Sequence, residues 1–257
     1  MLSEPLQVIA LVVAFLVAIV LIVRFASRGL LTRAARTWWR HPRALLVIGA
    51  VVVVGGLLAW FVQFALLELT VLGTLVDVVG TSSAWVLPFV ALTSAAVLLP
   101  VTAWVIGATM VVERGEDNAV RALGSASGAH AAVLRSAMLV AGILALALFV
   151  LPFFVILASF WLVAPAVSSR EHLGLRGSLR RSSGLLKGSR WRALGLTITL
   201  CLLIALGGVV GAAVLLVSSV SFTGAAVAVA VANAFILPYV ALVAVHFYEE
   251  VVGTGGS

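Results

Sequence analysis

The sequence predicts an all-α integral membrane protein, a polytopic bundle of transmembrane helices. Of its 257 residues, 63% are hydrophobic and only 10% are charged, and the mean hydropathy is +1.27. A soluble domain of this size needs far more charged residues to cover its surface. Several apolar stretches also approach or exceed the roughly 20 residues with which a helix crosses about 30 Å of hydrocarbon. Composition and stretch length therefore predict the fold class before any motif is considered.

Five apolar stretches each predict one crossing. They are residues 6–23, 44–67, a stretch within 84–112, 193–217 and 225–246. The first is preceded by no basic residue and followed at once by Arg24, so we expect an uncleaved anchor whose N-terminus lies outside. The third contains Pro88 and Pro100, which predict a kink near one of the two prolines.

A sixth stretch, residues 137–167, is 31 residues long and carries no charge. One straight helix of that length would measure roughly 46 Å. Fitting it into the bilayer would require a tilt of about 50°, beyond the usual range of about 0–40°. Pro152 lies at the midpoint, where a helix can break. We therefore predict two short helices that enter and leave the bilayer on the same face.

The placement of charge tests this hairpin independently. All sixteen basic residues lie in three segments, 24–43, 113–135 and 170–192. Short loops rich in Arg and Lys stay cytoplasmic, and a single crossing by 137–167 would expel the most basic of the three. The hairpin keeps all three inside and predicts seven crossings, with six as the alternative. It places the C-terminus on the cytoplasmic side of a plasma membrane. The excess of Arg over Lys among the basic residues indicates a prokaryote.

The chain is predicted to form a single transmembrane domain over residues 1–250, followed by a flexible tail at 251–257. After the anchor span, three repeat-like units follow, each with a basic or polar surface segment and then a helical hairpin. The units are residues 28–112, 117–167 and 171–247. The surface segment of the middle unit has the weakest helical periodicity, and a partial loop is the alternative there.

The other two surface segments are amphipathic at helical spacing. In the first, Leu31, Ala34, Ala35 and Trp38 share one face, and in the third Leu175, Leu179 and Leu186 do so. The basic residues lie on other faces, a pattern typical of helices that lie in the headgroup plane. Ordinary positive flanks of membrane spans remain the alternative. The candidate contacts with anionic lipid headgroups are Arg33, Arg36, Arg40, Arg176, Arg180, Arg181 and Lys187.

Residues 165–192 carry a longer pattern: a Pro ending a span, an acidic residue, Leu-Arg-Arg-Ser, a Leu, a Gly and an aromatic-Arg pair. The matching positions are Pro165, Glu171, Leu179, Arg180, Arg181, Ser182, Leu186, Gly188, Trp191 and Arg192. The pattern resembles that of prokaryotic multi-pass proteins related to the membrane domain of glycerophosphoryl diester phosphodiesterases, and of uncharacterised inner-membrane proteins grouped with it. The resemblance extends over 117–250, with departures at Phe153 and Ser178. It implies in-plane helices and hairpins and, for most members, no established activity.

No catalytic, cofactor or metal site is expected. Phosphodiester hydrolysis belongs to a separate soluble domain in that family, which this chain has no stretch to form. The four histidines, at positions 41, 130, 172 and 246, are scattered at span edges and in basic loops. The pair Glu249-Glu250 superficially resembles that of membrane CAAX-type proteases but lies at a helix end without a following Arg. The formal charge of +7 flanks apolar spans, so nucleic acid is not an expected partner.

The predicted function is accordingly that of a structural, lipid-interacting or accessory membrane component. A transporter or channel component is the alternative, with a polar pathway near Asn233, although a hydrogen bond across a helix contact is the favoured explanation of that residue. Gly207 and Gly211 form a small-xxx-small pair, which predicts close helix packing within the chain or between protomers.

Overall fold

The computed structural model describes residues 24, 25, 27, 29–68, 86–128, 135, 136, 138–140, 152–217 and 222–254. Every regular element among them is helical, which confirms the all-α prediction. The long helices are α3 (Pro42–Glu68), α5 (Val86–Glu113), α11 (Arg190–Val217) and α12 (Phe222–Thr254). The short ones are α2 (Leu30–Arg40), α6 (Ala119–Gly128), α8 (Pro152–Trp161), α9 (Ala164–Glu171), α10 (Leu175–Leu185) and the 3₁₀ turn η1 (Leu186–Gly188).

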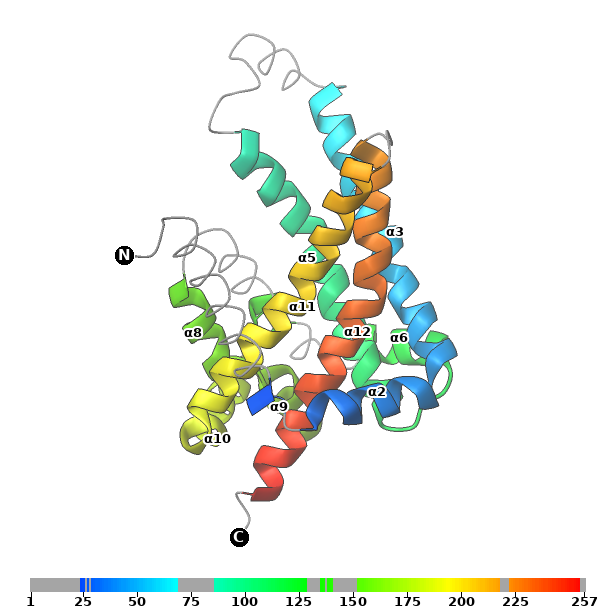
Figure 1. Cartoon of the computed structure of the whole chain (residues 1–257). Helices are drawn as coiled ribbons and strands as arrows, with labels where there is room; N and C mark the ends of the chain where they lie inside the picture. The colour runs from blue at the N-terminus through cyan, green and yellow to red at the C-terminus, as the bar shows by residue number, and fades with distance from the viewer. Residues whose placement is uncertain are drawn as a thin grey trace, which may run out of the picture.

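Helix α12 is the centre of the arrangement, because it packs against α3, α11, α5 and α2. The short helices α2, α6, α9 and α10 gather at one end of the long ones, and α2 lies across α12 there (Figure 1). We call the end of the bundle formed by α2, α6, α9 and α10 the basic end. The two segments predicted to lie in the headgroup plane thus occupy the same end of the bundle. The middle surface segment is helical over residues 119–128, residues 117 and 118 precede the helix, and residues 129–132 lie outside the described residues.

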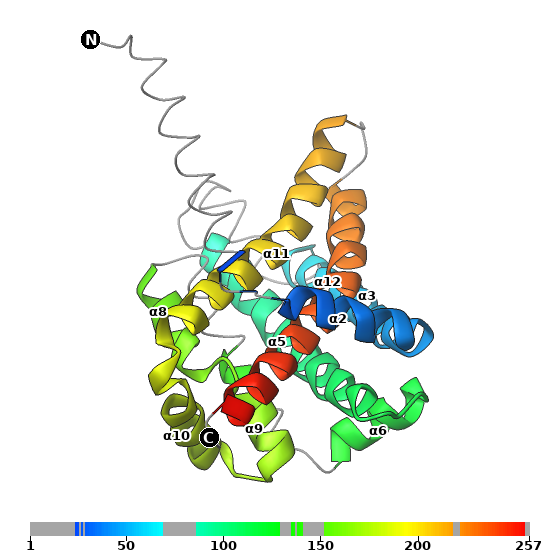
Figure 2. The ribbon, with the colours of Figure 1, turned by 60° about the horizontal axis from the view of Figure 1, so that its bottom comes forward.

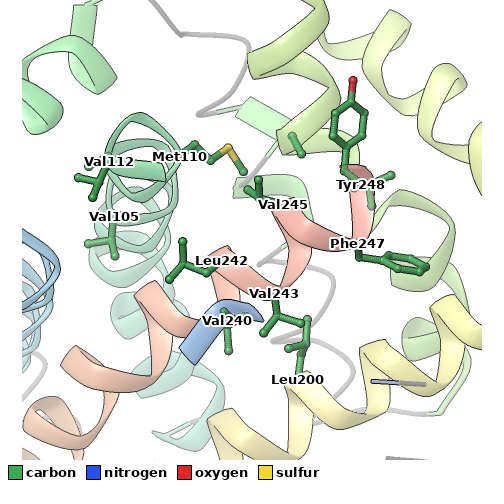
Figure 3. Packing of buried hydrophobic residues seen from close by; sticks show 14 of the residues in the cluster. Val105, Met110, Val112, Leu200, Val240, Leu242, Val243, Val245, Phe247 and Tyr248 are labelled. Atoms are coloured by element: carbon green, nitrogen blue, oxygen red, sulfur yellow. The ribbon is translucent and has the colours of Figure 1, made fainter. Parts of the chain in front are cut away.

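The apolar core follows the C-terminal half of α12. Leu242, Val243 and Phe247 are completely buried. Figure 3 shows Leu242 on the side of α12 toward α5 and Val243 on the side toward α11, where Leu200 lies. Where lipid surrounds the helices, close packing holds them together, because lipid tails are as apolar as the side chains.

Three described helices are long and apolar enough to cross a membrane. The qualifying stretches are Pro42–Ala59, Arg190–Gly207 and Val227–Gly253. They overlap the predicted spans 44–67, 193–217 and 225–246. The described part of α5 adds a shorter apolar stretch, Leu98–Glu113, in a helix that includes Pro100. The predicted anchor at 6–23 lies outside the described residues. These helices support a membrane protein, and they do not support the full count of seven spans.

The chain after α5 returns to the end of the bundle that it left. Glu113, the last residue of α5, accepts a hydrogen bond of 2.5 Å from Arg170 of α9, although the two residues lie 57 positions apart. This return agrees with the hairpin predicted for residues 137–167. The bend itself stays a prediction, because residues 141–151 lie outside the described part of the chain.

The second arm of that hairpin ends earlier than its lack of charge predicts. Helix α8 ends at Trp161, a turn follows, and α9 begins at Ala164 with Pro165 in its first turn. Proline suits the first turn of a helix, where its missing N–H has no partner to lose, and disrupts a helix interior. Residues 164–167 therefore belong to a buried helix at the basic end and not to a span.

The predicted boundary of the C-terminal tail is also too early. Helix α12 continues to Thr254, and Val251 is 93% buried within the core cluster. Of the predicted tail 251–257, only residues 255–257 lie outside the described helix. Val251 packs against the core, which keeps the last turn of α12 helical.

Glycines bring α12 close to its neighbours. A Cβ on Gly49 of α3 would lie 2.1 Å from the backbone oxygen of Ala234, and one on Gly207 of α11 would lie 2.9 Å from the Asn233 side chain. Small residues at such contacts let helix backbones approach closely. The predicted close packing at Gly207 is confirmed and occurs within the chain.

Replacing Gly49 with Ala should destabilise the bundle by about 1–3 kcal/mol, because the new methyl group can only be accommodated by moving α3 away from α12. Thermal unfolding in detergent measures the loss. Gly184→Ala is the matched control: a Cβ at Gly184, inside α10, meets nothing within 4 Å, so this variant should be neutral or slightly stabilised. Equal melting temperatures for the two variants would contradict the packing.

Candidate lipid-headgroup surface and ion-pair cluster

Helix α2 has the two faces that its sequence predicts. Leu30 and Ala34 are completely buried, whereas Arg33, Arg36 and Arg40 are exposed. The hydroxyl of Tyr239 on α12 donates a 2.9 Å hydrogen bond to the backbone oxygen of Leu31, which helps hold α2 across α12. Burial of one stripe against α12 thus turns the arginines outward.

Helix α10 is amphipathic as predicted, but its leucines are not its most buried face. Ser178 and Ser182 are completely buried, while Leu175 and Leu179 are half-buried. The Ser182 hydroxyl donates a 3.0 Å hydrogen bond to the backbone oxygen of Phe160 at the end of α8. At 100° per residue the serine face lies beside the leucine face. Helix α10 therefore contacts the rest of the protein through its serines, and its leucines lie along the edge of that contact.

Five exposed basic side chains of α2, α10 and η1 have no acidic partner among the described residues. They are Arg36 and Arg40 of α2, Arg176 and Arg180 of α10, and Lys187 of η1. None of the ion pairs formed within the described residues includes any of them. Figure 2, in which the bottom of Figure 1 comes forward, shows α2 and α10 with the end of α12 between them. Five of the seven predicted headgroup residues are therefore free to contact an external anion.

Arg33, by contrast, is exposed but paired with an acidic side chain of the protein. Its guanidinium donates a 2.5 Å hydrogen bond to Oε2 of Glu250 on α12, and Arg192 of α11 pairs with Oε1 of the same carboxylate. The Arg192 guanidinium carbon also lies over the Phe247 ring, 5.6 Å from its centroid. Glu250 thereby joins α2 and α11 to the end of α12.

Arg181, the other exception, pairs with Glu171. Its Nε lies 3.2 Å from Oε2 of Glu171, and the Tyr248 hydroxyl donates a 3.1 Å hydrogen bond to Oε1 of the same carboxylate. This contact connects α10 and the end of α9 to α12. Both Arg181 and Glu171 belong to the family-like motif, so two of its charged positions bind each other.

Three further motif positions are part of the packed structure. Pro165 lies in the first turn of the buried helix α9, Ser182 is buried, and Gly188 ends the turn η1. Trp191 at the start of α11 is 81% exposed, as is expected of an aromatic anchor at a membrane interface, and Trp39 at the end of α2 is 77% exposed.

The densest part of this end surrounds Arg170 of α9. Its Nη2 lies 2.5 Å from a carboxylate oxygen of Glu113 and 3.0 Å from one of Glu249. The ring of His246 lies 3.1 Å from Glu249 through Nδ1 and 3.0 Å from the Thr37 hydroxyl through Nε2. Since a carboxylate only accepts, Nδ1 of His246 donates to Glu249. Four helices, α2, α5, α9 and α12, meet at this cluster.

The donor atoms of Glu113, His246 and Glu249 lie within 4.8 Å of one another, so the three residues have the composition of a metal site. Arg170 already supplies a cation to both carboxylates. Burial is the strongest influence on Glu113 and raises the pKa of its carboxyl, although Arg170 opposes this. The arrangement is thus an ion-pair cluster that joins helices.

Sequence reasoning missed this cluster. It placed His246 at a span edge and treated Glu249-Glu250 as part of the chain end. The available signal was the spacing of three polar residues, His246, Glu249 and Glu250, on the last turns of an otherwise apolar helix that enters a basic region. Such residues are costly in an apolar helix unless they are paired.

Replacing Arg170 with Gln should lower the free energy of unfolding by about 2–3 kcal/mol, because it leaves the largely buried Glu113 and its neighbour Glu249 without their shared cation. Thermal unfolding in detergent tests this expectation. Arg176→Gln is the control, since Arg176 is exposed and unpaired among the described residues, and it should change stability by less than about 0.5 kcal/mol. A loss no larger for Arg170 than for Arg176 would refute the role of the cluster.

The comparisons with known proteins identify no relative: no protein-family model, curated protein or solved structure matches the chain.

Proposed function

We propose that the chain is a non-enzymatic multi-pass protein of a prokaryotic plasma membrane whose basic end binds anionic lipid headgroups. The observation that carries this proposal is the set of five exposed basic side chains on α2, α10 and η1 that have no acidic partner among the described residues. A protein that used these side chains only for its own stability would pair them, as it pairs Arg33, Arg170 and Arg181.

The geometry of α10 supports contact with a membrane surface. Arg176 and Arg180 are exposed and lie nearly opposite the buried Ser178 and Ser182. The half-buried leucines occupy the edge between the two faces. A helix with a protein face, an apolar edge and a cationic outer face fits the boundary between headgroups and acyl chains. Each basic residue near an anionic surface contributes about 1 kcal/mol of attraction, which salt screens.

The finer topology is part of the same proposal. We propose seven crossings, with the N-terminus outside and the basic end in the cytoplasm. The three candidate spans and the Glu113–Arg170 contact support it, since the chain between these two residues returns to the end that it left. The placement of α2, α6 and α10 at one end supports it too, because the positive-inside rule then acts on all of them together.

We also propose kinship with the membrane domain of glycerophosphoryl diester phosphodiesterases and its uncharacterised relatives. The motif at 165–192 supports the relation, and its Leu-Arg-Arg-Ser core contributes both a buried contact, Ser182, and an ion pair, Arg181. The kinship carries no catalytic assignment, because hydrolysis in that family belongs to a separate soluble domain.

A transport or channel component is the second candidate, and one observation favours it. The side-chain oxygen of Asn233 is buried in α12 and has no hydrogen-bond partner among the described residues. The hydrogen bond across a helix contact that would explain this oxygen is therefore not made there. An unsatisfied polar atom in a candidate span is costly, which makes this the position to test for a polar pathway.

The headgroup proposal predicts that replacing Arg176, Arg180 and Lys187 together with Gln reduces binding of anionic lipid. At about 1 kcal/mol for each charge, the affinity for phosphatidylglycerol should fall by up to about a hundredfold at low salt. Native mass spectrometry of the protein titrated with phosphatidylglycerol measures the change. A variant with Lys at positions 176 and 180 keeps the charges and should keep the binding; unchanged binding in the Gln variant would overturn the proposal.

The transport candidate is tested by reconstituting the protein and Asn233→Leu into liposomes and measuring ion and small-solute flux. Under the headgroup proposal, the two proteins should give equal, background flux, and the variant should be as stable as the parent or more so, because it removes an unsatisfied buried oxygen. A specific flux in the parent that Asn233→Leu abolishes would favour the transport function.

A further inference from the structure

A groove of about 510 Å³ lies between the start of α3 and the segment that joins α5 to α6. Its volume is in the range of small-ligand sites. Arg43 and Val47 line it from α3, and Glu116, Asp117 and Arg121 line it from the opposite side. It is separate from the ion-pair cluster and from the exposed basic residues of α2 and α10.

The groove presents charges of both signs that its own residues do not fully neutralise. Arg43 is exposed and forms no ion pair with any described residue, and Arg121 lies 3.9 Å from Glu116, a loose contact. The side chain of Asp117 is 81% exposed, and only its Oδ1 pairs, with Nδ1 of His41. The start of α6 supplies no anion site, since the Asn118 side chain already accepts from the N–H groups of residues 120 and 121.

An exposed apolar stripe begins at this groove and runs along α3. Val47 lines the groove, and Val54, Leu58 and Phe61 continue the same face of the helix, at exposures of 66%, 51% and 58%. The spacing of seven, four and three residues keeps them on one side. Since Pro42–Ala59 is a candidate span, such a stripe faces acyl chains.

We propose that the groove binds one phospholipid with a primary-amine headgroup, such as phosphatidylethanolamine. Arg43 and Arg121 bind the phosphate, Asp117 and Glu116 bind the ammonium group, and the acyl chains lie along the stripe of α3. A primary ammonium group donates N–H bonds to carboxylates, whereas a quaternary choline group has none to donate and is bound by aromatic rings. No aromatic residue lines the groove.

This proposal rests on the membrane placement in the proposed function but uses different residues. Headgroup binding at α2 and α10 depends on net positive charge, and it should favour any anionic lipid. Lipid binding in the groove depends on positive and negative side chains together. The groove should therefore favour a zwitterionic lipid with a free amine over both phosphatidylcholine and phosphatidylglycerol.

The test is native mass spectrometry of the full chain in detergent, titrated with phosphatidylethanolamine, phosphatidylcholine or phosphatidylglycerol of identical acyl chains. We expect one tightly bound phosphatidylethanolamine for each protein. Arg43→Gln should weaken phosphatidylethanolamine and phosphatidylcholine alike by about tenfold, because both carry the phosphate. Asp117→Asn should weaken phosphatidylethanolamine by about tenfold and leave phosphatidylcholine unchanged.

His41→Gln is the matched control for Asp117→Asn. It breaks the same ion pair without removing the carboxylate, and His41 does not line the groove, so phosphatidylethanolamine binding should be retained. Equal binding of the ethanolamine and choline lipids, or an Asp117→Asn effect that His41→Gln reproduces, would overturn the proposal. Tighter phosphatidylglycerol binding that is lost in Arg43→Gln would overturn it too, because the groove would then be a simple anion site.

The two lipid proposals fail separately. The Gln variant at positions 176, 180 and 187 should keep its single phosphatidylethanolamine even while it loses phosphatidylglycerol. If that variant still binds phosphatidylglycerol, the proposed function is wrong and the groove proposal is unaffected. If the parent shows no preference for the amine headgroup, the groove proposal fails alone.

Discussion

The structure depends on the charged C-terminal turns of α12. Helix α12 carries His246, Glu249 and Glu250 to the basic end, where they reach α2 through Arg33 and Thr37, α9 through Arg170 and α11 through Arg192. Some of the paired side chains are largely shielded from solvent, since Arg192 is 17% exposed and His246 is 11% exposed. Removing one partner of such a pair costs more than the pair itself contributes, because the other charge is left behind. The packing of apolar helices in lipid is weakly directional. The ion pairs add this directionality, because they determine which short helix lies against which long one.

The same contacts divide the basic residues into two groups. Arg33, Arg170, Arg181 and Arg192 pair with acidic side chains and hold helices together. The exposed residues of α2, α10 and η1 remain without acidic partners among the described residues. The paired residues lie toward the centre of the basic end, where α12 ends, and the unpaired ones lie on the outer faces of α2 and α10. Structural stability and surface charge therefore depend on different arginines, which is why variants can separate them.

Much of this arrangement could be predicted from the sequence because it depends on local properties. Apolar length predicted α3, α11 and α12, and spacing predicted the two faces of α2. The ion pairs could not be predicted, because their partners lie far apart in the chain: Arg33 and Glu250 are 217 residues apart. The serine face of α10 was missed for a related reason. A periodicity argument assigns burial to leucine, whereas Ser178 and Ser182 are small enough to fit against α8 and α9 and can satisfy their hydroxyls on nearby backbone oxygens. The boundary at Trp161 depended on Pro165, whose effect on helix continuity outweighs the absence of charge.

Under the proposed function, orientation and lipid contact depend on the same side chains. Short basic segments stay on the cytoplasmic side, and the anionic lipids of that leaflet attract the same side chains. If the protein were inverted, the five unpaired basic residues of α2, α10 and η1 would lose both their cytoplasmic placement and their contact with anionic lipid. The lost lipid contact amounts to about 1 kcal/mol for each residue. The paired arginines would lose little, because their acidic partners move with them. Under that proposal, the unpaired residues of α2, α10 and η1 contribute more to lipid contact than the paired arginines do.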